Sequence, residues 1–101
     1  MAKLEAIKPG EILQEEFLKG FGITAYRLSR ETGVSSTRIS EIVRGKRKIT
    51  VETALRFAKY FGNSPEFWLG IQNEYDLRTG KMEWENELKA IPDIHDLVHA
   101  K

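Results

Sequence analysis

Short hydroxyl side chains and cations are concentrated in one stretch of the sequence. Ser36, Thr37 and Ser40 are followed by Arg44 and then by three consecutive cations, residues 46–48. Hydroxyl groups and free backbone N–H groups at the start of a helix can bind phosphates and the edges of bases. Lysine and arginine side chains in a loop bind phosphate through their charge. These residue types in this order predict contact with a polyanion such as a nucleic acid.

Charge is divided unevenly along the 101 residues, although the net charge is only +1. Residues 24–48 contain seven basic and two acidic side chains, whereas residues 64–101 contain four basic and eight acidic ones. The first stretch suits a polyanion, and the second would repel one or attract a basic surface. The sequence has no cysteine, which excludes disulfides and thiolate zinc sites. Because no apolar run approaches membrane-spanning length, we expect a cytoplasmic protein.

No group of residues favours catalysis or metal binding. His95 and His99 have i, i+4 spacing and Asp96 lies beside them, but no third ligand is close in sequence. The pair Glu15-Glu16 and the three glutamates between residues 83 and 87 are typical of solvated helix faces. We therefore expect no enzymatic activity, no metal and no cofactor.

Capping residues and apolar spacing predict helices throughout, and no alternating β-branched run indicates a strand. Helix N-caps are expected at Thr24, Ser35, Thr50 and Ser64. The predicted helices cover residues 9–18, 25–32, 36–44, 51–61 and 65–77, and a sixth, poorer in apolar residues, covers 82–90. Residues 78–80 are expected to end the fifth helix. Residues 1–80 would then form a DNA-binding and dimerisation domain, and residues 81–101 a short acidic C-terminal extension.

Apolar side chains recur at helical spacing on the later helices. In the fourth helix the predicted inward face consists of Val51, Ala54, Leu55, Ala58 and Phe61. The aromatic residues from Phe57 to Tyr75 are expected to form core. The candidate dimer surface is whatever part of the apolar face of the fifth helix does not pack into the core, and it consists of Phe67, Trp68, Ile71 and Tyr75. For Trp68 and Ile71 the sequence leaves both places open, the core and the dimer surface.

The second and third predicted helices, joined by Gly33-Val34-Ser35, meet the requirements of a helix-turn-helix. Leu28, Ile39 and Ile42 would be buried between the two helices. Ser29 provides a small side chain where the helices cross, and Gly33 permits the turn. The third helix then projects five side chains outward, with Arg38 on the flank: Ser36, Thr37, Ser40, Glu41 and Arg44. The basic triplet after Gly45 is expected to be a mobile loop that contacts phosphate.

Short motifs extend from residue 9 to residue 77. They include Pro9-Gly10-Glu11-Ile12-Leu13, Gly33-Val34-Ser35, Gly45-Lys46-Arg47 and the segment from Phe61 to Leu69. With these motifs the sequence resembles the HigA-like antitoxins of bacterial toxin–antitoxin systems, in the Xre/Cro-type helix-turn-helix superfamily. Lys8, Ser29 and Gly70 stand where that family more often has histidine, alanine and asparagine.

The resemblance implies an all-α fold, a five-helix lambda-repressor-like domain that dimerises on an inverted-repeat operator of double-stranded DNA and represses its own operon. It also implies a cognate HigB-like toxin, an mRNA-cleaving ribonuclease that the antitoxin binds and neutralises. The reading helix and basic loop are carried over by position. Together with the two capping residues, the expected DNA-binding residues are Thr24, Ser35, Ser36, Thr37, Arg38, Ser40, Glu41, Arg44, Lys46, Arg47 and Lys48.

Two alternatives stay open at this point. One is a stand-alone phage-type repressor without a toxin, and the other is an antitoxin that binds only protein and does not use its helix-turn-helix. The toxin contact also has two candidates. These are the acidic residues 81–101, with Trp84 and Leu88 as anchors, and the N-terminal residues 1–8.

Overall fold

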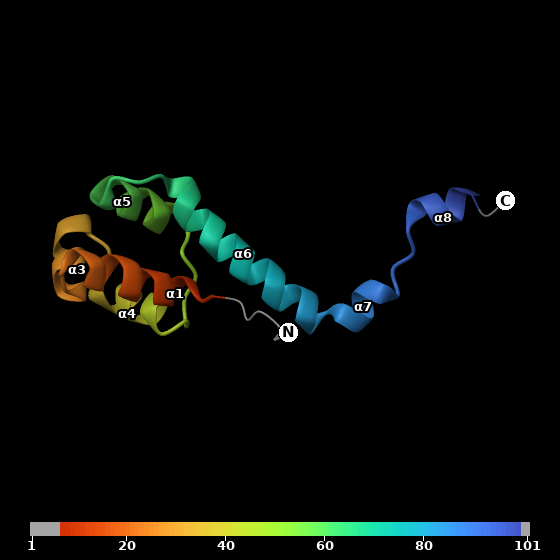
Figure 1. Cartoon of the computed structure of the whole chain (residues 1–101), viewed down its shortest axis with the longest axis horizontal. Helices are drawn as coiled ribbons and strands as arrows, with labels where there is room; N and C mark the ends of the chain where they lie inside the picture. Colours follow the sequence, from red (N-terminus) through yellow and green to blue (C-terminus); the bar gives the residue numbers. More distant parts are fainter. Residues whose placement is uncertain (1–6, 100–101) are drawn as a thin grey trace.

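The computed structural model describes residues 7–99, and within that range every regular element is a helix (Figure 1). The chain begins with one continuous helix made of α1 (Pro9–Ile12), the wider π-helical η1 (Leu13–Leu18) and α2 (Lys19–Phe21). It continues through α3 (Ala25–Thr32), α4 (Ser36–Val43), α5 (Val51–Phe61) and α6 (Pro65–Glu83). Two short helices follow, α7 (Glu85–Lys89) and α8 (Ile94–His99). The all-helical prediction is confirmed, although the first helix extends about one turn beyond its predicted end at Leu18.

Four helices begin at the hydroxyl residues that the sequence predicts. The side-chain oxygens of Thr24, Ser35, Thr50 and Ser64 each accept a hydrogen bond from the backbone N–H three residues later, at 3.0, 3.1, 3.5 and 3.0 Å. Each bond satisfies one N–H of the first turn that has no partner inside its own helix. These caps fix where α3, α4, α5 and α6 start, and therefore which side chains face the core.

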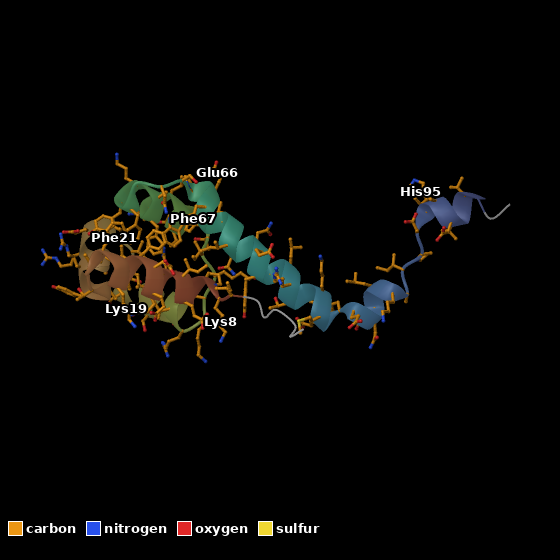
Figure 2. All side chains as sticks on the ribbon, viewed as in Figure 1. Lys8, Lys19, Phe21, Glu66, Phe67 and His95 are labelled. Carbon is orange, nitrogen blue, oxygen red and sulfur yellow. The ribbon has the colours of Figure 1, made fainter. Side chains whose placement is uncertain are left out.

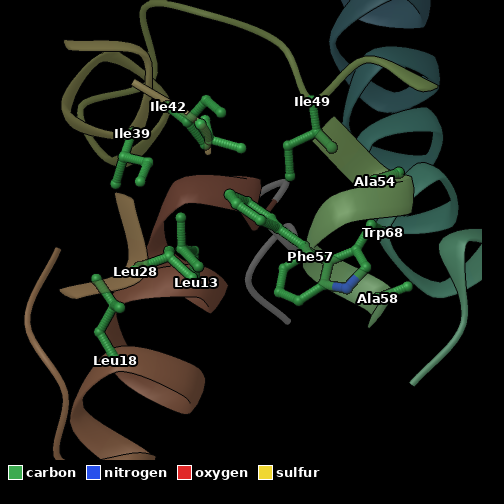
Figure 3. Close-up of a cluster of buried hydrophobic side chains, with 11 residues drawn as sticks. Leu13, Leu18, Leu28, Ile39, Ile42, Ile49, Ala54, Phe57, Ala58 and Trp68 are labelled. Atoms are coloured by element: carbon green, nitrogen blue, oxygen red, sulfur yellow. The ribbon is translucent and has the colours of Figure 1, made fainter. Parts of the chain in front are cut away.

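The core lies where the first helix, α3, α4, α5 and the first turns of α6 meet (Figure 3). Its largest fully buried side chains include Leu13, Leu28, Ile39, Phe57 and Trp68. The Trp68 ring lies 4.6 Å from that of Phe17 and 5.3 Å from that of Phe57, measured between centroids. Its Nε1 donates to Asn63 Oδ1 at 2.9 Å, so the one polar atom of the ring is satisfied. Burying each large apolar side chain contributes about 1.5–3 kcal/mol.

The predicted inward face of α5 is partly wrong. Val51 and Leu55 are 60% and 53% exposed, while Thr53 is completely buried. Phe57 is completely buried, and helical geometry brings Thr53 and Phe61, four residues before and after it, to the same side of the helix. Val51 and Leu55 therefore lie on the opposite side of the helix, against solvent.

α6 does not end at residues 78–80 as predicted but continues to Glu83. The Glu74–Arg78 ion pair at 2.6 Å and the bond from the Thr79 hydroxyl to the Tyr75 carbonyl at 3.0 Å hold this part of the helix. A glycine inside a helix costs only about 1 kcal/mol, so Gly80 does not break it. The helix bends away only at Trp84, where φ is −109° and ψ is 24°.

The second half of α6, with α7 and α8, forms an arm that leaves the bundle (Figure 1). The described chain measures 62 by 29 by 22 Å and has a radius of gyration of 18.0 Å. A compact chain of 100 residues would have about 13 Å. We use the name acidic arm for residues 77–98.

Candidate nucleic-acid interface

The turn between α3 and α4 is built by a glycine and a threonine. Gly33 has a φ of +82°, in the left-handed region that glycine adopts without strain. The Thr32 hydroxyl donates to the Leu28 carbonyl at 2.6 Å and accepts from the Val34 N–H at 3.2 Å. Val34 is 1% exposed and seals the turn against the core. This geometry is that of the predicted helix-turn-helix.

The exposed face of α4 agrees with the pattern on which the site prediction rests. Ile39 and Ile42 are buried, whereas Ser36, Thr37 and Ser40 are exposed. Arg44 is exposed at the end of the helix, and its Nε lies 3.4 Å from the Ser40 carbonyl. The hydroxyl groups of α4 therefore form one solvent-facing edge that starts at the N-terminal end of the helix.

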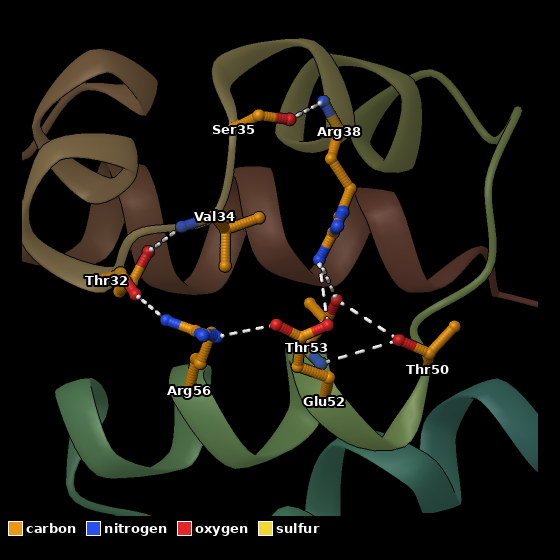
Figure 4. A network of polar contacts seen from close by, with 8 residues as sticks. All are labelled: Thr32, Val34, Ser35, Arg38, Thr50, Glu52, Thr53 and Arg56. Carbon is orange, nitrogen blue, oxygen red and sulfur yellow. Dashed lines mark hydrogen bonds and ion pairs between the residues drawn. The ribbon is translucent and has the colours of Figure 1, made fainter.

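Arg38 points away from this edge and binds α5 instead. Its Nη1 lies 3.4 Å from Thr53 Oγ1 and 3.7 Å from Glu52 Oε1 (Figure 4). The same glutamate accepts from Arg56 Nε at 3.1 Å, and Arg56 Nη1 donates to the Thr32 carbonyl at 2.8 Å. We expected Arg38 to be available to base or backbone. In this structure it is part of a network that joins the turn and α4 to the start of α5.

The basic loop, which we expected to be mobile, contacts the rest of the bundle at several points. The backbone N–H of Lys46 donates to the Glu41 carbonyl at 2.7 Å, and Gly45 has a φ of +77°. Arg47 Nε pairs with Glu41 Oε1 at 2.7 Å. We expected Glu41 to project outward, but it is half-buried and pairs with the loop that follows its own helix.

Two residues of α6 hold the end of the loop, and the sequence prediction missed both. Gln72 Oε1 accepts from the Ile49 N–H at 2.9 Å, and its Nε2 donates to Asp76 Oδ1 at 3.1 Å. The other Asp76 oxygen pairs with Lys48 Nζ at 3.3 Å. The sequence held a signal for the burial of Gln72, because this residue follows Trp68 by four positions and so lies on the same face of α6.

The start of α1 supports the loop from its other side. Gly10 is buried against the last turn of α4, and a Cβ at this position would lie 2.0 Å from the Ile42 carbonyl oxygen. Here α1, the basic loop and α6 surround a pocket of about 270 Å³. Its charged lining consists of Lys8, Lys46, Arg47, Lys48 and Asp76.

The predicted dimer surface needs correction. Trp68 is completely buried in its own chain, because the aromatic core surrounds it, and it therefore has no surface to offer a second copy. Ile71 and Tyr75 are half-buried, and Phe67 is 38% exposed. Further along, in the acidic arm, several more large apolar side chains are exposed, among them Leu77, Met82, Trp84, Leu88, Ile91, Ile94 and Leu97.

The outer surface of α3 carries a second polar cluster. The Tyr60 hydroxyl donates to Glu31 Oε1, and Arg27 Nε pairs with the same carboxylate at 3.3 Å. The bond from Tyr60 and the nearby arginine lower the pKa of Glu31, while the bond to Glu31 raises the pKa of Tyr60. This cluster ties α3 to α5.

His95, one of the two histidines considered for metal binding, lies at the far end of the described chain from the bundle (Figure 2). His95 Nδ1 lies 2.9 Å from Asp93 Oδ1, and the His95 backbone lowers the pKa of that carboxyl through a hydrogen bond. The His99 side chain lies outside the described part of the structure. Among the residues described, no group of three or more acidic, histidine or cysteine side chains could hold a metal ion, and no helix is long and apolar enough to cross a membrane.

Comparison with known proteins identifies the class. Residues 15–68, more than half of the chain, match the family model described as Helix-turn-helix. Virulence-associated protein I of Dichelobacter nodosus is 44% identical over 90 residues, which cover 89% of this chain and 83% of that protein. Antitoxin HigA-1 of Vibrio cholerae is 35% identical over 92 residues, which cover 91% of this chain and 87% of that protein.

A solved structure of Pseudomonas aeruginosa antitoxin HigA with the higBA promoter has a similar fold. Its TM-score is 0.83 and its sequence identity is 36%, over 88% of this chain and 97% of that one. Together, the fold and the family match place the protein in the helix-turn-helix class. Within that class, the chain belongs to the HigA-like antitoxins of the Xre/Cro-type superfamily, as its motifs predicted.

Proposed function

We propose that this protein is an antitoxin and a transcriptional autorepressor. It binds an inverted-repeat operator in its own promoter as a homodimer and neutralises a cognate HigB-like ribonuclease in the cytoplasm. It acts by binding and not as an enzyme. The observation that carries the proposal is the exposed hydroxyl edge of α4, held in place by the buried contacts between α3 and α4, in a chain that is similar to an antitoxin solved with the higBA promoter.

Base reading is assigned to the start of α4. Ser36, Thr37 and Ser40 are short enough for the helix to enter the major groove closely, and their hydroxyls can donate to or accept from base edges. Thr24 and Ser35 lie at helix N-termini, which suit phosphate. One helix of eight residues contacts too few bases for specific binding, so two copies are needed.

Phosphate binding is assigned to the cations next to that edge. Arg44 and Lys46 form no ion pair with another described residue, whereas Arg47 and Lys48 each have a carboxylate partner. All four follow α4 directly in the chain and are exposed. Contacts of this kind supply affinity without sequence preference.

The test is binding of the purified protein to DNA from its own promoter over a range of salt concentrations. Roughly five to eight phosphate contacts per dimer predict a log–log slope of about −5 to −7. If the protein is an antitoxin that binds only protein, almost no binding to this DNA is expected and no salt dependence. A small basic reading frame directly upstream of the gene would favour the antitoxin over a stand-alone phage-type repressor.

Toxin binding is assigned to the acidic arm. Residues 83–98 carry five acidic side chains and one lysine, and Trp84 and Leu88 are 53% and 49% exposed among them. A ribonuclease toxin presents a basic surface to RNA, and an acidic surface with apolar anchors complements it. The other candidate segment falls mostly on residues 1–6, which lie outside the described part of the structure.

A matched pair of double variants tests this assignment. Trp84→Ser with Leu88→Ser should weaken binding of the purified upstream gene product, while Val51→Ser with Leu55→Ser removes exposed apolar surface elsewhere and should leave it unchanged. Light scattering on the free protein accompanies both. If the arm variant binds the toxin normally and instead dissociates the dimer, the arm is the dimer surface and the assignment to the toxin is wrong.

A further inference from the structure

A buried glutamine on α6 determines where the basic loop rejoins the bundle. Gln72 is 8% exposed, and its Oε1 accepts from the backbone N–H of Ile49 at 2.9 Å. Ile49 itself is 3% exposed, so its N–H is shielded from water. A buried N–H without an acceptor is costly, so the chain would have to move if Gln72 were absent. The end of the loop is therefore set by α6 and not by the reading helix.

A carboxylate one turn further along α6 completes a chain of contacts back to the loop. Asp76 Oδ1 accepts from Gln72 Nε2 at 3.1 Å, which fixes which end of the glutamine amide faces Ile49. Asp76 Oδ2 lies 3.3 Å from Lys48 Nζ. The Lys48 side chain is 72% exposed and the Asp76 side chain only 34%. The lysine is thus a solvent-facing cation paired with a less exposed carboxylate of α6.

We propose that Gln72 and Asp76 are positioning residues for DNA binding with opposite effects. Gln72 fixes the path of the basic loop, and Asp76 holds the Lys48 ammonium against α6 and so withholds one positive charge per protomer from the DNA backbone. This inference rests on the DNA-binding part of the proposed function. It makes α6 a second determinant of operator affinity, besides the α3–α4 pair.

The charge balance explains why Asp76 weakens binding. A lysine that neutralises a phosphate releases counterions, and the salt dependence records how many such contacts form. A lysine that must first leave a carboxylate contributes less binding free energy when it contacts a phosphate. The carboxylate that is left behind also repels phosphates near it. Asparagine at this position keeps a carbonyl oxygen for Gln72 Nε2 and loses only the charge.

The first experiment compares Asp76→Asn with Glu74→Gln. Both remove one negative charge from α6, but Glu74 pairs with Arg78 and has no contact with the loop. On promoter DNA near 150 mM salt, Asp76→Asn should bind about three- to tenfold more tightly, as expected for two exposed ion pairs per dimer. Its log–log salt slope should steepen by up to about 2, since each extra phosphate contact adds about 0.9. Glu74→Gln should match the wild type.

A Lys48→Ala substitution in both backgrounds isolates the lysine. It should weaken binding more in Asp76→Asn than in the wild type, because only there is the ammonium free to bind phosphate. If Asp76→Asn behaves like Glu74→Gln in affinity and slope, the inference is wrong even though the protein binds DNA. If the wild type ignores promoter DNA at low salt, the proposed function fails as well.

A second set of variants tests the role of Gln72. Gln72→Leu should expose the Ile49 amide to fast hydrogen exchange and weaken binding to all DNA sequences alike, by about tenfold or more. The double variant Gln72→Glu with Asp76→Asn reverses donor and acceptor between the two side chains and keeps an acceptor for Ile49. It should restore slow exchange and DNA binding. Slow exchange at Ile49 in Gln72→Leu, or no rescue in the double variant, would overturn this role.

Discussion

Two glycines of the first helix should respond oppositely to the same substitution. A Cβ at Gly10 would lie 2.0 Å from the Ile42 carbonyl oxygen and 2.6 Å from that of Val43. A Cβ at Gly20 would meet nothing within 4 Å. The atoms that oppose Gly10 are backbone atoms of the last turn of α4, so they cannot rotate away as a flexible side chain could.

The magnitudes follow from these distances. Alanine is preferred over glycine inside a helix by about 0.5–1 kcal/mol, which Gly20→Ala should gain in full. Gly10→Ala must separate α1 from α4 by more than 1 Å to reach an ordinary contact of 3.4 Å. Overpacking of this kind costs about 1–3 kcal/mol and outweighs the helical gain. Gly10→Ala should therefore be destabilised and Gly20→Ala stabilised.

Chemical and thermal unfolding of both variants measure the effect. In a domain of this size, 1 kcal/mol shifts Tm by about 4–8 °C, so opposite shifts are easily separated. Gly70→Ala is a second control, because Gly70 is also open in the middle of α6. Operator affinity should fall in Gly10→Ala alone, since the displaced end of α4 carries the basic loop.

One result would refute this reasoning. If Gly10→Ala is as stable as Gly20→Ala and binds the operator normally, the close approach of α1 to α4 does not exist in solution. The assignment of α1 as the support of the reading helix would then be wrong.

Three further predictions concern the interface and its surroundings. Thr37→Ala should change the base preference at one operator position, with a change of about 1–3 kcal/mol in the binding free-energy difference between bases there. Binding to a full set of operator variants measures this. Arg47→Ala should weaken binding to all DNA sequences alike and reduce the salt dependence of the affinity, as measured by titration at several salt concentrations. Because the pKa of Glu31 is lowered in the folded protein, its carboxylate stabilises the fold at pH values above about 4.3, the ordinary pKa of glutamate. This stability is lost as the pH falls through the lowered pKa. Tyr60→Phe should therefore reduce the acid sensitivity of unfolding, and an unchanged pH profile would contradict the role of this bond.

Local signals were sufficient wherever one residue determines its own backbone. Thr24, Ser35, Thr50 and Ser64 cap their helices as predicted, because an N-cap needs only a hydroxyl within reach of the next turn. Gly33 was identified in the same way, since a left-handed residue is required at that turn. Helical spacing alone predicted the buried Ile39 and Ile42 and the exposed hydroxyl residues of α4, but it was wrong for Glu41, which is half-buried against Arg47.

Predictions that depend on a neighbouring element were less accurate. Helical spacing placed Leu55 inward, but Phe57 occupies the core and turns the Leu55 side of α5 to solvent. Trp68 was included in the candidate dimer surface because helical spacing does not show which aromatic side chains of other helices surround a residue. Residues 78–80 have the composition of a helix end, yet contacts within the helix carry α6 past them.

The sequence by itself determined the class of fold, the four caps and the hydroxyl edge of the reading helix, since all of these depend on residues within one or two turns of each other. Only the tertiary structure decided which cations are free. Arg38 is directed to Glu52 and Thr53, and Lys48 to Asp76 on a helix 28 residues further along. Such pairings depend on how helices pack, and no local pattern encodes the distance between side chains so far apart in the chain.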